Sequence, residues 1–415
     1  MILIKKRLIF PITLSLLGSL FFFPTPLVVN ADELDNHTAV VLGSGGNRGS
    51  YEIGVWKALR ELNIHYDIVT GSSIGSINAA LMATDDFDTA LNMWENINED
   101  DVFTDPPSEE EKKLLESLPS SSLQDIFIIL SGCVNGPRDV TPFKEFINTN
   151  IDTDKLLASN VTWGTYVIDY YNHKVKDITQ TNVDSDDLNS YILASASPYP
   201  VFPLVEIDGV SYMDGGYYDE LPIDLASQLG AENIIAVDIT PSTIKPNKVD
   251  TDNITYIYPD WDLGNFLDFD HQQVIKNIAY GYNDTMQKYG IYDGFKYTFN
   301  KGYTDRSAEG KTLKESMNPI LNATIYDSTN GSLNMNQYYL RCAEVSAETF
   351  NIDPSAVYDI DNLNKLILNN YQNNSIVQSI LKNIQMGVPL TTSFASKYPM
   401  ETISAIYINF LQKSQ

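Results

Sequence analysis

A serine held between two glycines is the feature that most constrains how this chain can fold. Ser73 stands between Gly71 and Gly75, directly after the apolar pair Ile68 and Val69. The apolar pair predicts the end of a short buried strand, and the apolar residues that follow recur at helical spacing: Ile74, Ile77 and Leu81. This is the G-x-S-x-G elbow, a sharp strand-to-helix turn that presents a nucleophilic hydroxyl. Side chains at the two glycine positions would collide with neighbouring segments. A Ser/Gly-rich turn without chemistry is the alternative.

A glycine-rich loop precedes the elbow by one strand–helix unit. It runs from Gly43 to Gly49, between an apolar run at 38–42 and a helical pattern. The loop does not fit a dinucleotide fingerprint, because Arg48 stands where the last glycine belongs, and no Gly-Lys-Ser/Thr follows as in a Walker A loop. Backbone N–H groups at a helix start form a nest for an anion. The loop is therefore a candidate oxyanion hole, with a purely structural glycine turn as the alternative.

Three segments taken together resemble the motifs of the patatin-like phospholipases. Residues 43–49 resemble the family's G-G-G-x-R/K-G loop, with Ser44 in place of the first glycine of the triplet. Residues 70–79 resemble its nucleophile elbow, and Asp214-Gly215-Gly216 resembles its Asp-Gly-Gly/Ala motif. The resemblance spans roughly residues 36–245. It implies a three-layer α/β/α fold with a mainly parallel central sheet, and a lipolytic acyl hydrolase that uses no metal and no cofactor.

The same resemblance implies a Ser–Asp dyad. Ser73 would attack the ester carbonyl, and Asp214 would act as general base and then return the proton to the departing alcohol. The expected oxyanion loop consists of Gly45, Gly46, Asn47 and Arg48, with Arg48 orienting the loop or meeting a phosphate. The remaining motif glycines are Gly49, Gly71, Gly75, Gly215 and Gly216.

Histidine offers an alternative base. The chain has four histidines, and His271 follows Asp214 in the Ser…Asp…His order of α/β-hydrolases. Its surroundings, Asp268-Phe269-Asp270-His271-Gln272, are typical of an acidic helix start. Asp214 is therefore the preferred base.

Changes in composition along the chain predict four segments. Residues 1–31 combine basic residues, an apolar run and a small-residue cleavage site, as in a signal peptide; an uncleaved N-terminal anchor is the alternative. Residues 32–250 are expected to form the catalytic domain, since apolar strands alternate with helices there. Residues 251–304 are expected to be helices packing on it, and residues 305–415 a C-terminal helical region. The signal peptide predicts a secreted protein.

Charge limits the partners of the chain. The sequence has 27 basic and 54 acidic residues, a net charge of −27, and loss of the three signal cations would bring it near −30. Such a surface excludes nucleic acid and opposes anionic membranes, unless a few lysines form a local basic patch. Lipid or phospholipid is the expected substrate, with transient contact to a membrane surface.

Cys133 and Cys342 form no disulfide framework, and whether they pair stays open. A catalytically silent secreted binding module is the alternative function.

Overall fold

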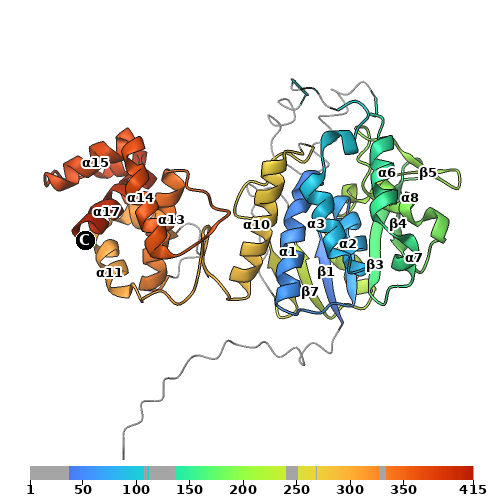
Figure 1. The fold of residues 1–415 in the computed structure, drawn as a ribbon, viewed down its shortest axis with the longest axis horizontal. Helices are drawn as coiled ribbons and strands as arrows, with labels where there is room; N and C mark the ends of the chain where they lie inside the picture. The colour runs from blue at the N-terminus through green and yellow to red at the C-terminus, as the bar shows by residue number, and fades with distance from the viewer. Residues whose placement is uncertain are drawn as a thin grey trace, which may run out of the picture.

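The computed structural model describes residues 37–106, 108, 110–111, 136–239, 251–267, 269–326 and 333–414. It shows a sheet with helices on both sides and, beside it, a second region made mostly of helices (Figure 1). The predicted signal peptide and Cys133 lie outside the described residues. Among the described helices, none has the length and apolar character needed to cross a membrane.

The central sheet has eight strands in the order β5-β6-β3-β2-β1-β7-β8, with β4 paired to β3. Strands β3, β2, β1, β7 and β8 are parallel to one another. Strands β4 and β6 each pair antiparallel with β3, and the edge strand β5 pairs antiparallel with β6. The expected mainly parallel sheet is therefore confirmed. The strands are β1 (Thr38–Leu42), β2 (Ile68–Gly71), β3 (Thr162–Asp169), β4 (Lys174–Thr179), β5 (Val205–Ile207), β6 (Val210–Asp214), β7 (Asn233–Val237) and β8 (Ile254–Ile257).

Helices cover both faces of this sheet, as in a three-layer α/β/α fold (Figure 1). Strand β1 is buried throughout: Val40 and Leu42 enter the large core on one face, while Ala39 and Val41 enter a smaller core that includes Ala226 on the other. Burial on both faces explains its unbroken apolar run. The helices are α1 (Ser50–Glu61), α2 (Ile74–Ala83), α3 (Phe87–Asn96), α6 (Thr141–Asn150), α7 (Thr153–Leu157), α8 (Ser185–Ser195), α9 (Ile223–Gln228) and α10 (His271–Lys288), with 3-10 turns η2 (Gly46–Gly49), η3 (Glu99–Asp101) and η4 (Gly215–Tyr217).

The C-terminal region has a hydrophobic core of its own, in which α13 and α17 are the most deeply buried helices. A small three-stranded sheet, β11-β10-β9, lies on the side that meets α10. The elements are β9 (Asp293–Gly294), β10 (Thr298–Phe299), α11 (Ser307–Ser316), α12 (Pro319–Tyr326), α13 (Met335–Thr349), β11 (Val357–Tyr358), α14 (Ile360–Asn370), η5 (Tyr371–Asn373), α15 (Ser375–Gln385), α16 (Thr392–Lys397) and α17 (Pro399–Lys413).

Residues 251–304 differ from the expected set of helices. Strand β8 pairs in parallel with β7, so the catalytic sheet continues past the expected boundary at residue 250. Strand β10 pairs with β11, and Tyr297 and Phe299 are buried in the C-terminal core, so that core begins before residue 305. Both differences have one cause: a half-buried four-residue edge strand and two-residue strands leave too short an apolar pattern to detect.

Candidate active site

The turn around Ser73 is strained in the manner of a nucleophile elbow. Ser73 has φ 54° and ψ −125°, outside the regions that a residue with a Cβ ordinarily adopts, and it is the N-cap of α2. A Cβ on Gly71 would lie 2.1 Å from the Gly75 carbonyl oxygen, and one on Gly75 would lie 2.6 Å from that of Gly43. Both glycines are thus required for the tight turn, and the second also lets the elbow approach the glycine loop.

Asp214 meets Ser73 from the other side of the site. It is the last residue of β6, which runs antiparallel to β3. The Ser73 hydroxyl donates a 2.7 Å hydrogen bond to Asp214 Oδ2, and the Gly216 amide donates a 2.8 Å bond to Oδ1. A Cβ on Gly215 would lie 2.0 Å from the Tyr166 carbonyl oxygen, so glycine is needed where this turn packs against β3. The structure therefore brings together two residues that are 141 positions apart in the sequence.

Burial brings the pKa of the Asp214 carboxyl into the range that suits a general base. Its side chain is fully buried, and the loss of hydration raises its pKa to about 7, although the hydrogen bonds from Ser73 and Gly216 partly oppose this rise. The negative charge of Glu220 raises the pKa further. A general base works best with a pKa near the working pH, because it is then both ionised and able to hold a proton.

The glycine loop divides into amides that are engaged and amides that are available. The Asn47 N–H donates to the Phe266 carbonyl at 2.8 Å, and the Arg48 N–H donates to Gly45 at 3.2 Å. Within the part of the chain that the structure describes, no acceptor meets the amides of Gly45 and Gly46. The expected use of the Asn47 amide as an oxyanion donor is therefore wrong in this structure: a Phe266 carbonyl, distant in sequence, already accepts it.

Gly46 and Arg48 fix this loop against the segment before α10. Gly46 has φ +55°, and a Cβ there would lie 2.1 Å from the Phe266 carbonyl oxygen. Arg48 Nε donates to the Gly264 carbonyl at 2.9 Å, so this side chain orients the loop, one of its two expected roles. Burial lowers the pKa of Arg48, and the nearby carboxylate of Asp262 partly offsets this effect.

Three polar side chains of the glycine loop and the elbow are buried without a hydrogen-bond partner within the described parts of the chain. The side chains of Ser44, Asn47 and Ser72 are buried, and among the described residues they have no hydrogen-bond partner. Buried polar groups are normally satisfied, so these atoms are suited to contact water or a bound substrate.

Asn78 connects the elbow helix to the glycine loop. Its Nδ2 donates to the Gly49 carbonyl at 3.0 Å and to Glu52 Oε2 at 2.7 Å, while its Oδ1 accepts from Trp94 Nε1 at 2.9 Å. Burial raises the pKa of Glu52 well above its ordinary value, and the hydrogen bond from Asn78 partly opposes this rise. The sequence contains a sign of this role, because Asn78 is a polar residue within an apolar helix pattern, five residues after the nucleophile.

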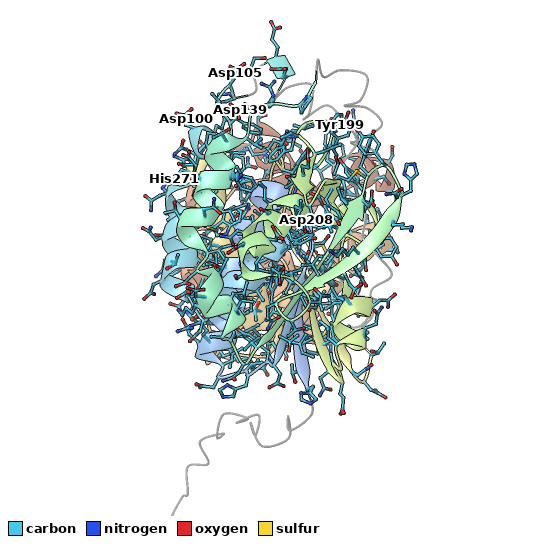
Figure 2. The ribbon with its side chains drawn as sticks, turned by 90° about the vertical axis from the view of Figure 1, so that its right-hand side faces the viewer. Asp100, Asp105, Asp139, Tyr199, Asp208 and His271 are labelled. Carbon is cyan, nitrogen blue, oxygen red and sulfur yellow. The ribbon has the colours of Figure 1, made fainter. Side chains whose placement is uncertain are left out.

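The histidines lie away from this arrangement. All four are exposed, and His271 is the first residue of α10, at the outer edge of the molecule in Figure 2. The Ser73 hydroxyl is already bonded to Asp214. The geometry thus favours the dyad over a triad. Among the described residues, no group of three or more His, Cys, Asp or Glu side chains could hold a metal ion. Cys342 is a buried free thiol in the C-terminal core.

A family model described as patatin-like phospholipase matches residues 40–227, which include the glycine loop, the elbow and the Asp-Gly-Gly turn. Residues 40–227 belong to the patatin-like phospholipase family. In this patatin-like segment, Ser73 lies near the start and Asp214 near the end of the matched region. Ser73 follows the carboxyl end of β2, and Asp214 ends β6, which runs in the opposite direction.

Curated relatives match about half of the chain. Patatin-like phospholipase domain-containing protein 6 of Mus musculus is 29% identical over 204 residues, which is 49% of this chain and 14% of that protein. Neuropathy target esterase sws of Drosophila melanogaster is 30% identical over 209 residues, which is 49% of this chain and 13% of that protein. Lysophospholipase nte1 of Aspergillus niger is 28% identical over 206 residues, which is 48% of this chain and 12% of that protein. The match thus spans about an eighth of each relative's length.

Two solved structures were also found. VipD from Legionella pneumophila is similar with a TM-score of 0.36 and 14% identity, over 91% of this chain and 90% of that one. The type III effector protein ExoU is similar with a TM-score of 0.31 and 14% identity, over 92% and 78%.

Proposed function

We propose that this protein is a serine acyl hydrolase of the phospholipase A type, which cleaves carboxylic ester bonds of lipids. The observation that carries the proposal is the 2.7 Å hydrogen bond from the Ser73 hydroxyl to a buried Asp214, made from a strained elbow. Membership of residues 40–227 in the patatin-like family supports a lipid as the substrate. The names of the relatives, a lysophospholipase and an esterase among them, support the same class of reaction.

In the proposed first step, Ser73 Oγ attacks the ester carbonyl carbon while its proton passes to Asp214 Oδ2. The carbonyl oxygen gains the negative charge, which the unengaged amides of Gly45 and Gly46 stabilise at the start of η2. Loss of one such donor typically costs about 3–4 kcal/mol of transition-state stabilisation. The bond from carbon to the alcohol oxygen then breaks, and Asp214 returns the proton to that oxygen.

The second step releases the acid. A water molecule attacks the acyl-Ser73 ester, and Asp214 takes the water's proton as general base. The Oγ–carbon bond breaks, Ser73 Oγ recovers a proton from Asp214, and the fatty acid leaves. The residues of this scheme supply a nucleophile, a base and anion-binding amides.

The proposed reaction is tested by treating phosphatidylcholine vesicles with the wild-type protein and with Ser73→Ala, Asp214→Asn and His271→Ala. We expect the wild type and His271→Ala to release fatty acid at rates within a few-fold of each other. Ser73→Ala and Asp214→Asn should lose roughly 10⁴-fold or more in rate while keeping their circular dichroism spectra. An inactive wild type would favour a silent binding module, and loss of activity in His271→Ala alone would favour a triad.

We also propose that the protein is exported and meets its lipid substrate by transient contact with a membrane surface. The basic, apolar and small-residue pattern of residues 1–31 supports export, and an uncleaved anchor is the alternative. N-terminal sequencing of protein recovered from the medium of an expressing culture tests this. A mature chain that begins at Asp32 is expected, whereas a cell-bound chain that begins at Met1 would favour the anchor.

A further inference from the structure

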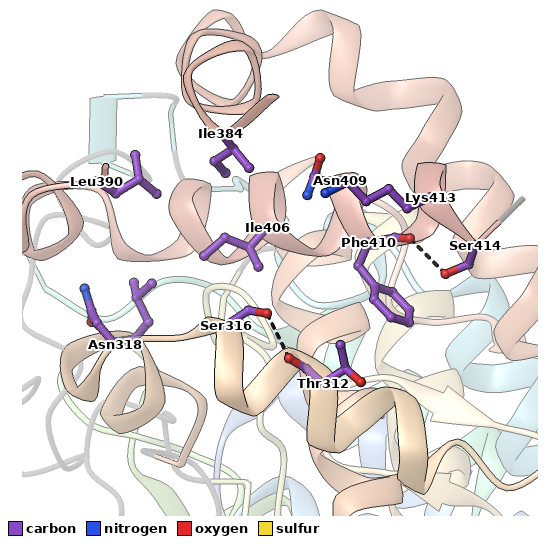
Figure 3. A pocket seen from close by; sticks show the side chains of 11 residues that line it. Thr312, Ser316, Asn318, Ile384, Leu390, Ile406, Asn409, Phe410, Lys413 and Ser414 are labelled. Atoms are coloured by element: carbon purple, nitrogen blue, oxygen red, sulfur yellow. Dashed lines mark hydrogen bonds between the residues drawn. The ribbon is translucent and has the colours of Figure 1, made fainter. Parts of the chain in front are cut away.

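The C-terminal region contains a cavity that plays no part in the proposed chemistry. Its volume is 590 Å³, within the usual range of small-molecule sites. Figure 3 shows α17 crossing between α15 above and α11 below, with side chains of all three elements turned into the space. The apolar walls are formed by Leu321, Ile384, Leu390, Ile406 and Phe410, and the polar lining by Thr312, Ser316, Asn318, Asn409, Lys413 and Ser414.

The polar lining has one sign of charge. None of the eleven lining residues is acidic, and Lys413 is the single ionisable one. Hydroxyl groups of the lining are already engaged on their own helices: Ser316 donates to the Thr312 carbonyl at 2.8 Å and Ser414 to the Phe410 carbonyl at 2.9 Å. Within the described ranges, neither the Lys413 ammonium nor the Asn409 amide has such a partner, which leaves a cationic donor and an amide four residues apart on α17.

The chain around the cavity departs from the charge of the whole protein. The full sequence has 54 acidic residues among 415, yet from residue 362 onward Glu401 is the single acid, against four lysines. Seven of the eleven lining residues come from this stretch, on α15, on α17 and on the segments that follow these two helices. An anion that the remainder of the protein would repel therefore finds a favourable local potential at this end.

Apolar side chains also lie exposed beside the opening. Met386 is 59% exposed and Val388 46% exposed, on the turn that joins α15 to the lining residue Leu390. These exposed side chains lie between the lining residues Ile384 and Leu390 in the sequence, so they offer a hydrocarbon chain further apolar surface, whose removal from water is favourable.

From these observations we propose that the cavity is a second lipid site, which binds a single long-chain fatty-acid anion. The hydrocarbon chain lies against Leu390, Ile406 and Phe410, and the carboxylate meets Lys413 and the Asn409 amide at the polar end. That this ligand is also a product of the enzyme rests on the proposed function, whereas the binding itself does not. The site gives the helical region a role separate from the dyad.

The binding is measured with cis-parinaric acid, a fluorescent fatty acid, on the full chain whose Ser73 has first been labelled with a long-chain fluorophosphonate. This label fills the catalytic site, and Ser73→Ala with no label serves as a second background. We expect saturable binding of one probe per chain in both. Oleate should displace the probe, and oleyl alcohol, which has the same chain without the carboxylate, should need a far higher concentration.

Variants of the cavity decide the assignment. Lys413→Glu should weaken binding at least about fivefold, since it reverses the one charge of the lining. Leu390→Trp should abolish binding by filling the space, and Lys144→Glu, an equal charge change at an exposed position of α6, should leave it unchanged. Both cavity variants should retain wild-type hydrolysis. Three results would each overturn the proposal, whether or not hydrolysis is observed. They are wild-type affinity in Lys413→Glu and Leu390→Trp, displacement of the probe by oleyl alcohol at the same concentration as by oleate, and loss of binding when Ser73 is labelled.

Discussion

At the scale of single residues, Asp214 carries two opposing demands. It must be ionised to accept the Ser73 proton, yet its side chain is fully buried, and this burial raises its pKa to about 7. At pH 5 the carboxyl is therefore mostly protonated and cannot act as a base. The residue sits where a small change in pH decides whether the site is active.

This predicts the pH dependence of the reaction. We expect kcat/KM for a soluble short-chain ester to rise about tenfold per pH unit up to a pH near 7 and then to level off. Initial rates between pH 5 and 9 provide the measurement, with stability checked at each pH. A rate that is flat down to pH 5 would show that Asp214 ionises at its ordinary pKa or is not the base.

The same burial predicts that Asp214→Asn stabilises the fold. Above pH 7 the carboxyl is charged in both the folded and unfolded states, and a pKa difference between about 7 and 3.8 corresponds to a cost of up to about 4 kcal/mol. As the pH falls from 7 toward 4, the folded state takes up the proton first, and the cost disappears. Urea unfolding should show Asp214→Asn more stable than wild type at pH 8 and similar to it at pH 4.5. A less stable Asp214→Asn at pH 8 would contradict this.

Sequence reasoning predicted correctly those features that depend on local pattern, such as the conformation of the turn around Ser73. Ser73, Gly71 and Gly75 could be assigned because a strand-to-helix turn imposes its own glycine spacing. The Asn47 amide could not be assigned correctly, because its partner, the Phe266 carbonyl, is 219 residues away and leaves no trace near the loop. Which backbone donors remain available is decided by tertiary contacts.

At the scale of elements, Asn78 joins α2, the glycine loop and α3 through three hydrogen bonds. These bonds hold the helix that carries the nucleophile against the end of the loop that carries the amides. The strands and helices that carry the site could be predicted from the sequence where their apolar runs were long, as for β1, β2 and α2. Strand β8 and the pairing of β10 with β11 were not, because each contributes too few buried positions to give a period.

Asn78→Ala should therefore impair catalysis beyond its cost in stability. It leaves the Gly49 carbonyl, Glu52 and Trp94 without a buried partner, so we expect a loss of about 3 kcal/mol or more in unfolding free energy and at least about tenfold in kcat. Asn364→Ala is the matched control, because Asn364 is equally a buried hydrogen-bond bridge, between Tyr339 and Tyr407 in the C-terminal core. It should lose stability with kcat unchanged. An equal effect of both variants on kcat would make Asn78 merely structural.

At the scale of the whole molecule, acidic side chains are gathered at one end of the catalytic region. Asp100, Asp105 and Asp139 gather at one end of the molecule, the end at which Tyr199 also lies (Figure 2). The Tyr199 carbonyl accepts a 2.9 Å hydrogen bond from the hydroxyl of Tyr217, the residue after Gly216. Acidic side chains thus lie at the end of the molecule where Tyr199 is bonded to the turn that follows Asp214, in keeping with the net charge of −27.

This distribution predicts which bilayers the enzyme prefers. At low salt we expect faster hydrolysis of phosphatidylcholine vesicles than of phosphatidylglycerol vesicles, since the acidic end is repelled by anionic lipid. The difference should narrow at higher salt, where the Debye length falls to about 8 Å or less. Initial rates on both vesicles at two ionic strengths test this. Faster hydrolysis of phosphatidylglycerol that salt weakens would show that a local basic surface governs adsorption.

The central claim is that Ser73 is a nucleophile activated by Asp214. The most direct measurement is covalent labelling with a fluorophosphonate, followed by mass spectrometry of the digested protein, for the wild type, Ser73→Ala and Asp214→Asn. We predict one adduct per chain, on the peptide that contains Ser73, with labelling absent in Ser73→Ala and slowed at least about 100-fold in Asp214→Asn. An adduct on another residue, or labelling of Asp214→Asn at the wild-type rate, would contradict the claim.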